Sequence, residues 1–298
     1  AKKTLSLCRE ICNDEQTPRN VPEMGDQYTA NSSIVTPKDL ANVALQYVTN
    51  KIAGPDGILS YTFKGFHEPA LTRSIEKALL RVDAQLDVDL QRNCSGRDAE
   101  VNIVEFAATE RTDPVTGQTV WNVGKATPNN RSWTIFWSDT QDFTGVSPLE
   151  VIIHEWGHVL GLADADSHDP LRTETTSAET VMSYNRLKND PGNYFRALDV
   201  EALTLLWGPE TSAPEQRAPF VDETNAKDAS SFAWEVQGLL ETTASNADFL
   251  SGAYITILDR AVDPNGASWW TTQLEQGLSR RAVVDTLLLS TEFLELLG

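Results

Sequence analysis

The sequence is poor in basic residues, with 24 lysines and arginines against 43 aspartates and glutamates in 298 residues, and a net charge of −19. Because nucleic-acid binding needs clustered basic side chains, this balance argues against a nucleic-acid partner. No stretch approaches the roughly 20 apolar residues that cross a bilayer, so we expect no membrane span. The acidity favours solubility outside the cell. The apolar stretch after Lys2 and Lys3 is too short for a signal peptide, so we expect a leader already removed or another export signal.

Composition divides the chain into four parts. Residues 1–57 are rich in Asn, Thr, Pro and Asp, and we interpret them as a wrapping or pro-like segment. Residues 58–208 carry the strand and helix patterns of one large domain. A Pro-rich polar run within 209–231 predicts a linker, and 232–298 has helical patterns throughout. The fold class we expect is an α+β domain followed by a small all-α domain.

Four β-prone runs, at 60–63, 101–106, 120–123 and 133–137, predict the strands of one twisted mixed sheet. Apolar residues at steps of three and four from Leu71 to Leu90 predict one long amphipathic helix between the first two strands. That stripe is core packing, and no cofactor site is read from it.

A second helix is predicted from Ser147, where Ser147 can act as the cap, Pro148 occupies the first turn and Glu150 completes a capping box. Along this helix His154 and His158 are four residues apart, so both imidazoles face the same side and can reach one metal ion. Glu155 projects beside them. Gly161 then ends the helix, because glycine tolerates a left-handed conformation that turns the chain back toward the metal.

The segment from His154 to Asp164 resembles the elongated zinc-binding motif of the metzincins, whose usual form ends in a third histidine. In this chain the third position is Asp164, and a carboxylate oxygen is an acceptable zinc ligand. The resemblance includes some metzincins with aspartate there. Asp166 and His168 lie in the same segment and remain alternative third ligands, His168 because nitrogen is a good zinc donor.

Downstream residues extend the resemblance over about 58–208. Thr180-Val181-Met182-Ser183-Tyr184 resembles the metzincin Met-turn, in which a methionine forms an apolar floor beneath the metal. The resemblance implies that Tyr184 can approach the zinc and then stabilise the oxyanion. Residues 194–208 resemble the last helix of a serralysin-type domain, and 124–128 fall where that group has the sheet edge that pairs with substrate.

The C-terminal residues depart from the serralysins, because the Gly- and Asp-rich calcium repeats are missing. Residues 253–293 are instead similar to a helical domain of unknown function related to phycobilisome linker domains, which recurs in exported bacterial proteins. Asp263 and Asn265 are expected in a turn between helices, since an EF-hand loop needs further oxygens. A calcium site near Asp139 and Asp142 stays open.

The resemblance implies a secreted zinc endopeptidase that cleaves protein or peptide substrates, with Glu155 as general base and Tyr184 as oxyanion donor. Three ligands leave a coordination position for water, whereas a structural zinc site has four protein ligands. Two alternatives remain: a self-processing surface or assembly protein whose helical domain mediates binding, and an inactive zinc scaffold. Oligomeric state is not assigned. Serine catalysis finds no support, since the other histidines are His67 and His168.

The three cysteines, Cys8, Cys12 and Cys94, leave one thiol over if Cys94 pairs with one of the others. The simpler interpretation is a buried thiol. The sharper one is that the remaining thiolate binds the zinc in a latent form, because thiolate is a strong zinc ligand.

Overall fold

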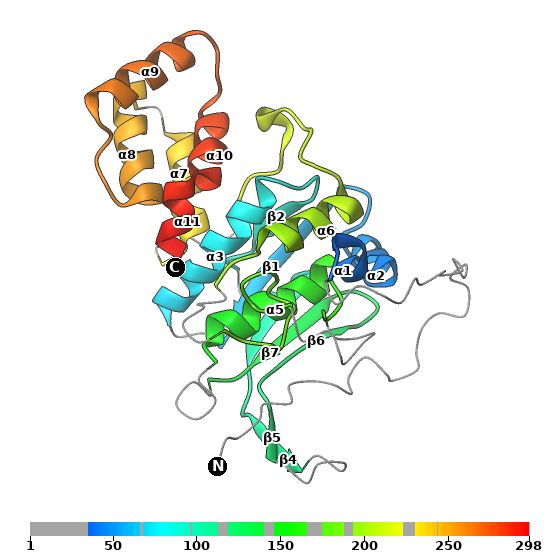
Figure 1. Cartoon of the computed structure of the whole chain (residues 1–298). Coiled ribbons are helices and arrows are strands. Elements are labelled where there is room, and N and C mark those ends of the chain that lie inside the picture. The colour runs from blue at the N-terminus through cyan, green and yellow to red at the C-terminus, as the bar shows by residue number, and fades with distance from the viewer. Residues whose placement is uncertain are drawn as a thin grey trace. The chain divides into compact units, whose positions relative to one another are not determined.

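The computed structural model describes residues 35–65, 68–95, 97–112, 119–139, 146–165, 175–187, 193–222, 230–242 and 244–297. These residues form two compact units (Figure 1). One unit comprises the described parts of residues 1–51, 105–129 and 133–206, and the other comprises those of 52–104, 130–132 and 207–298. Neither unit, in its described part, has a helix long and apolar enough to cross a membrane. The boundaries between the four predicted parts of the chain, at residues 57, 208 and 231, stay predictions.

The first unit is built around the helix α5 (Pro148–Leu160), which packs against the antiparallel strands β6 (Gly124–Pro128) and β7 (Trp133–Trp137). Alternation along β7 buries Trp133, Ile135 and Trp137. The unit also contains α1 (Pro37–Leu40), α2 (Val43–Ala53) as far as residue 51, and α6 (Ala197–Trp207). Helix α5 therefore packs on β6 and β7 with one face (Figure 1).

Helix α2 is fixed to the end of α5 by one buried hydroxyl. Thr49 donates a hydrogen bond to the main-chain oxygen of Val159 at 2.5 Å and accepts one from the Trp133 indole at 3.0 Å. The Asn42 amide also donates to the Gly161 carbonyl at 2.8 Å. Because buried polar groups need partners, these bonds define how α2 lies on α5. The described part of the predicted wrapping segment therefore packs on the helix that carries His154 and His158.

The second unit contains the parallel strands β1 (Ile58–Lys64), β2 (Asp89–Arg92) and β3 (Val101–Glu105), and the helix α3 (Pro69–Asp83). Together with β6 and β7 these strands form a mixed sheet of order β2-β1-β3-β7-β6, in which β6 is an edge strand. The predicted mixed α/β character is confirmed. The strand predicted at 120–123 does not join this sheet, because β5 (Thr119–Asn122) pairs with β4 (Thr109–Thr112) in a separate hairpin.

The prediction of one helix from Leu71 to Leu90 is wrong at its C-terminal end. Helix α3 stops at Asp83, and Leu90 lies in β2, opposite Leu59 of β1. The Asp83 carboxylate accepts the Leu90 amide at 2.7 Å, which holds the turn between helix and strand. Leu86 and Leu90 are both buried, so the apolar spacing of the helix continues by coincidence into the next element.

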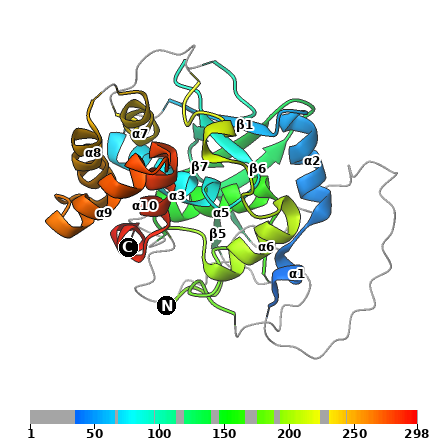
Figure 2. The ribbon, with the colours of Figure 1, turned by 90° about the horizontal axis from the view of Figure 1, so that it is seen from above.

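Five helices make up the end of the chain within the described residues, and Figure 2 labels α7 to α10 among them. They are α7 (Phe232–Glu241), α8 (Asn246–Leu258), α9 (Pro264–Glu275), α10 (Arg280–Leu289) and α11 (Thr291–Leu297), preceded by the short 3-10 turn Pro214–Gln216. Side chains of Ser231, Ser245, Asp263 and Ser279 cap four of them. Asp263 lies between α8 and α9 as predicted and accepts the amides of Asn265 and Gly266, but Asn265, predicted in the same turn, lies in the first turn of α9.

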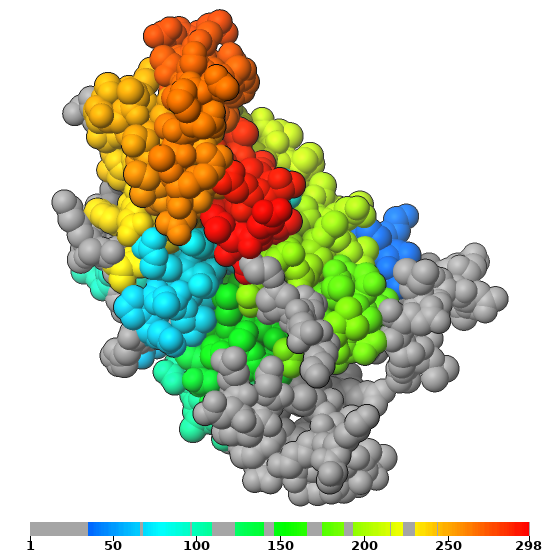
Figure 3. All heavy atoms as spheres, turned by 60° about the vertical axis from the view of Figure 1, so that its left-hand side comes forward, coloured from blue at the N-terminus to red at the C-terminus, as the bar shows by residue number. Residues whose placement is uncertain are grey.

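The Glu76 side chain of α3 joins that helix to α7. The carboxylate, which is 0% exposed, accepts hydrogen bonds from the Ser231 hydroxyl and from the amides of Phe232 and Ala233, and it pairs with Arg92 at 3.0 Å. The amides are the otherwise unpaired donors at the N-terminus of α7, where a negative charge is favoured. Figure 3 shows α3 in cyan beside the yellow and orange helices of this unit.

Arg217, within the predicted linker, is a second buried ionic centre of this unit. Its side chain is 1% exposed and contacts Asp83 at 2.5 Å and Asp285 at 3.2 Å. Arg281 of α10 also contacts Asp83, at 3.1 Å. Because one partner left alone would be a buried unpaired charge, these residues stabilise the unit only as a complete group.

We expect Glu76→Ala to lower the free energy of unfolding by about 3–5 kcal/mol, because it leaves Arg92 buried without its carboxylate and three donors of α7 without an acceptor. Chemical denaturation would measure it. The matched control is Glu295→Ala, an exposed glutamate on α11, which should change stability by less than about 0.5 kcal/mol. Equal effects of the two substitutions would contradict this account.

Candidate metal centre

The helix α5 begins and ends at the predicted residues, but only the Ser147 half of the predicted capping box is formed, because the Glu150 carboxylate pairs with Arg186. The Ser147 hydroxyl accepts the Glu150 amide at 3.1 Å and Pro148 lies in the first turn. At the other end Gly161 has φ = 102°, a left-handed conformation that side chains with a Cβ avoid. The Leu162 amide then donates to the Gly157 carbonyl at 2.7 Å, which turns the chain back along the helix.

Two main-chain carbonyls orient the imidazoles of His154 and His158. His154 Nδ1 lies 2.9 Å from the Val181 oxygen, and His158 Nδ1 lies 2.9 Å from the Leu162 oxygen. A carbonyl can only accept, so each Nδ1 carries a proton and donates it. In each neutral ring the lone pair is therefore on Nε2, which is the arrangement seen in histidines that bind metals.

Asp164 faces both of these nitrogens. Its Oδ1 lies 3.3 Å from His154 Nε2 and 3.4 Å from His158 Nε2. One ligand atom from each residue lies within 4.8 Å of the others, and this is the group of potential metal ligands found among the described residues. Ligands about 2.0–2.1 Å from a tetrahedral zinc ion lie roughly 3.3 Å apart. The donor types and separations therefore fit a zinc-sized ion.

The pKa values of the three groups in the cluster depend on one another. Burial by itself lowers the pKa of His158, but the Asp164 carboxylate outweighs burial and raises that pKa to about 9. Burial and Asp164 oppose each other in the same way at His154, whose pKa is raised. At Asp164 burial favours the neutral acid, yet the two imidazoles hold its pKa well below the usual range. Either protons or a metal ion must balance this carboxylate.

Glu155 lies between α5 and the edge strand β6. Its carboxylate accepts a hydrogen bond from the main chain of Ala126, and burial raises its pKa while the two imidazoles oppose that shift. Gly124 makes this approach possible, because a Cβ there would lie 2.8 Å from Glu155 Oε1 and 2.4 Å from Val151 Cγ1. Glu155 is therefore a buried carboxyl group beside the cluster, and β6 holds it in place.

The turn after Thr180 forms the floor and one side of the site. Met182 is 0% exposed, and its Sδ is so close to α5 that a Cβ on Gly157 would lie 2.4 Å from it. The Tyr184 hydroxyl donates a hydrogen bond to Asp164 Oδ1 at 2.9 Å. The hydroxyl oxygen of Tyr184 also lies 3.5 Å from His154 Nε2. Tyr184 thus contacts Asp164 of the cluster, and Met182 packs against α5 at Gly157, between the two histidines in the sequence; the role of Met182 beneath a metal ion stays a prediction.

Asp199 of α6 holds this turn in place, and the sequence analysis gave it no role. Its buried carboxylate accepts the Thr180 hydroxyl, the Val181 amide at 3.0 Å and the Arg196 amide at 2.8 Å. Because Val181 presents its carbonyl to His154, Asp199 positions that imidazole indirectly. A polar residue within the apolar pattern of 197–207 is the signal that could have indicated it.

The close approaches at Gly124 and Gly157 were not predicted, although residues 124–128 were placed at the sheet edge that pairs with substrate. Each glycine lacks a Cβ where a side chain of another element packs against it, and the sequence does not show which element that is. Several predicted candidates lie outside the described residues, namely Asp166, His168, His67, Asp142, Cys8 and Cys12. The alternative third ligand, the thiol hypothesis and the calcium site therefore stay predictions, and Asp139 is exposed.

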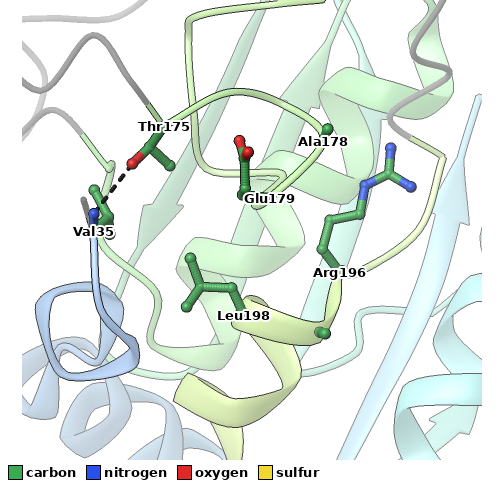
Figure 4. A pocket seen from close by; sticks show the side chains of 7 residues that line it. Val35, Thr175, Ala178, Glu179, Arg196 and Leu198 are labelled. Carbon is green, nitrogen blue, oxygen red and sulfur yellow. Dashed lines mark hydrogen bonds between the residues drawn. The ribbon is translucent and has the colours of Figure 1, made fainter. Parts of the chain in front are cut away.

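Two of the cavities among the described residues of this unit bear on the site. One, of about 320 Å³, opens beside the cluster and is lined by His154, Glu155 and Tyr184 among others. The second, of about 550 Å³, is drawn in Figure 4, where the Val35 amide donates to the Thr175 hydroxyl at 3.1 Å and Glu179 and Arg196 also line the wall. No member of the cluster lines the second cavity, so it is separate from the candidate site.

Comparison with known proteins concerns the helical end of the chain. Residues 230–297 match the family model of a domain of unknown function, DUF4214. The match covers α7 to α11, is less than a quarter of the chain, and does not include the metal cluster. No curated protein matches the chain.

We expect Gly157→Ala to destabilise the protein by about 1–3 kcal/mol, because the new methyl group overlaps Met182 Sδ and forces the floor of the site to move. The matched control is Gly238→Ala in α7, where a Cβ meets nothing within 4 Å and should stabilise the helix by about 0.5–1 kcal/mol. Denaturant unfolding measures both. In the double variant Gly157→Ala/Met182→Ala the two costs should be less than additive, and full additivity would sink this explanation.

We also expect binding of a divalent ion at pH 7 to release at least one proton, because His158, with a pKa of about 9, is protonated in the metal-free cluster and must lose that proton to become a ligand, and the pKa of His154 is raised as well. Protons and the metal ion compete for His158, so the affinity for the metal ion should fall as the pH drops below about 9. Calorimetric titration in two buffers of different protonation enthalpy measures the release. Identical heats in both buffers would contradict it.

Proposed function

We propose that the chain is a zinc metallopeptidase of the metzincin type that hydrolyses peptide bonds in protein or peptide substrates outside the cell. The observation that carries this proposal is the convergence of two oriented imidazoles and one carboxylate beside a second, buried carboxyl group. The first three groups, His154, His158 and Asp164, are the proposed ligands. Glu155 is the proposed general base.

Zinc is the metal that this donor set favours. Imidazole nitrogen together with a carboxylate oxygen is a usual zinc ligand set, whereas calcium and magnesium prefer sites made of oxygen alone. When bound in such a site, zinc lowers the pKa of a coordinated water and polarises a carbonyl group. Three ligands within the described residues leave a fourth position for water, which is typical of catalytic and not of structural zinc sites.

The position of Glu155 supports the role of general base. Burial raises the pKa of Glu155 above its ordinary value, which makes its carboxylate a stronger base. In the proposed reaction its carboxylate takes the proton of the attacking water and then passes a proton to the leaving amine. The hydrogen bond from the Ala126 main chain fixes the carboxylate for both transfers.

The edge strand β6 provides a place for an extended substrate. It is the last strand in the sheet order, so its outer edge can pair with a peptide by main-chain hydrogen bonds. Ala126 of this strand contacts Glu155, so a peptide bond on that edge lies close to the base. Tyr184, whose hydroxyl now donates to Asp164, is the proposed donor to the oxyanion once it moves from that contact.

We expect Glu155→Gln to keep one zinc ion per chain and to lose nearly all peptide hydrolysis, because glutamine has no base but the ligands remain. Asp164→Ala should lose the metal as well. Tyr184→Phe should keep the metal and lower kcat by about 10²–10³. Elemental analysis and a fluorogenic peptide assay of each variant measure these effects.

The outcome that would refute the proposal is normal cleavage by Glu155→Gln, or a wild-type protein without stoichiometric metal. Cleavage of the chain itself, with no activity on unrelated polypeptides, would instead favour the self-processing alternative. Metal bound without any hydrolysis would favour the inactive scaffold.

A further inference from the structure

Helix α9 differs from the rest of the chain in its lack of charge. Charged residues make up 22% of the sequence, but Glu275 is the single charged residue among the 12 residues Pro264–Glu275. The helix packs on α8, and Figure 3 shows it in orange at the surface of its unit. Its exposed side is therefore polar mainly through amide and hydroxyl groups, in a protein whose net charge is −19.

Trp269 is the large side chain on this surface. It is 55% exposed, and its ring centroid lies 4.5 Å from that of Trp270 in an edge-to-face contact of 74°. Trp270 is buried, and its indole N–H donates a hydrogen bond to the hydroxyl of the buried Tyr254 at 2.9 Å. Because a fixed side chain supports it, the Trp269 ring presents aromatic surface to the solvent and loses little conformational freedom on binding.

Uncharged side chains that form hydrogen bonds surround Trp269 on one side of α9. They lie four residues before it and three, four and seven residues after it, which places them beside or in line with the ring. Glu275 lies six residues after Trp269 and is therefore about a third of a turn away from this row. We define the α9 face as Asn265, Trp269, Thr272, Gln273 and Gln276.

An aromatic ring bordered by neutral donors and acceptors matches the chemistry of a sugar. The C–H faces of a sugar ring are apolar and pack on an aromatic ring, while its hydroxyl groups exchange hydrogen bonds with amides and hydroxyls. A charged partner would meet no opposite charge on the α9 face, and a polyanion is also repelled by the net charge of −19. A protein partner usually needs a larger apolar patch, whereas polar side chains border Trp269.

We infer that the α9 face binds a neutral polysaccharide, with Trp269 as the ring on which a sugar stacks. This inference is independent of the proposed peptidase activity, because it uses no residue of the metal cluster. The α9 face lies within the residues that match a domain of unknown function. Those residues would then attach the chain to a polysaccharide matrix.

The test measures binding of the full chain to four neutral polysaccharides, namely cellulose, chitin, starch and mannan, and to two charged ones, alginate and dextran sulfate. Co-sedimentation measures binding to the insoluble polymers, and tryptophan fluorescence follows titration with soluble oligosaccharides of the same sugars. We expect the wild-type protein to bind at least one neutral polymer and neither charged polymer. Binding should persist after the metal is removed with a chelator, because the α9 face contains no metal ligand.

Substitutions then test the α9 face itself. Trp269→Ala should weaken binding about tenfold or more, whereas Trp269→Phe keeps an aromatic ring and should retain most of the affinity. Gln273→Ala removes one amide from the same face and should weaken binding by a smaller factor. The matched control is Leu296→Ala, which shortens an apolar side chain of α11 that is 44% exposed and should leave binding unchanged. Melting temperatures establish that the variants are folded.

A wild-type protein that binds none of the four neutral polymers, or that binds the charged ones equally well, would overturn the inference. Affinity that stays at the wild-type value in both Trp269→Ala and Gln273→Ala would also overturn it. If Trp269→Ala does not fold, an unchanged affinity of Gln273→Ala is sufficient to reject the inference. None of these results bears on the peptidase proposal, which depends on the metal cluster.

Discussion

The contact of one buried carboxylate with two imidazole nitrogens is the interaction on which the site depends. Asp164 Oδ1 lies 3.3 and 3.4 Å from the Nε2 atoms of His154 and His158, and carbonyl groups behind the rings point both nitrogens toward it. Acceptors that converge in this way repel one another unless positive charge lies among them. The donor types and separations of the cluster fit a cation, and neighbouring elements hold the arrangement.

Three glycines allow the neighbouring segments of the site to approach one another closely. Gly161 turns the chain so that Asp164 returns to the helix, Gly157 leaves space for Met182, and Gly124 leaves space for the Glu155 side chain. Asp199 holds the turn whose Val181 carbonyl orients His154. The site is thus rigid because several close approaches support one another, which is the condition for a precisely placed metal and base.

The helical end of the chain depends on a different interaction. Glu76 of α3 caps α7 and pairs with Arg92, while Asp83 joins Arg217 to Arg281. The residues that match DUF4214 therefore share buried ionic contacts with a helix that precedes them by more than 140 residues. We expect this helical end to unfold together with α3 and not as an independent module.

The sequence predicted the metal helix well because its signals are local. The Ser147 cap, the spacing of His154 and His158, and the glycine that ends the helix all act within a few residues. It failed where the cause lies elsewhere in the fold. Leu90 continues the helical spacing of α3 but is buried by pairing with β1, and β5 joins a hairpin because β4 lies beside it. Gly157 and Asp199 acquire their roles only from Met182 and the turn at Thr180.

X-ray absorption at the zinc edge, on protein purified without added metal, tests the central claim most directly. We expect a first shell of nitrogen and oxygen at about 2.0–2.1 Å, with the outer-shell signal of two imidazoles. A third imidazole would assign the remaining position to His168 in place of Asp164. One sulfur beside the two imidazoles would support the latent thiolate form, whereas a first shell without imidazoles, or the absence of metal, would contradict the account.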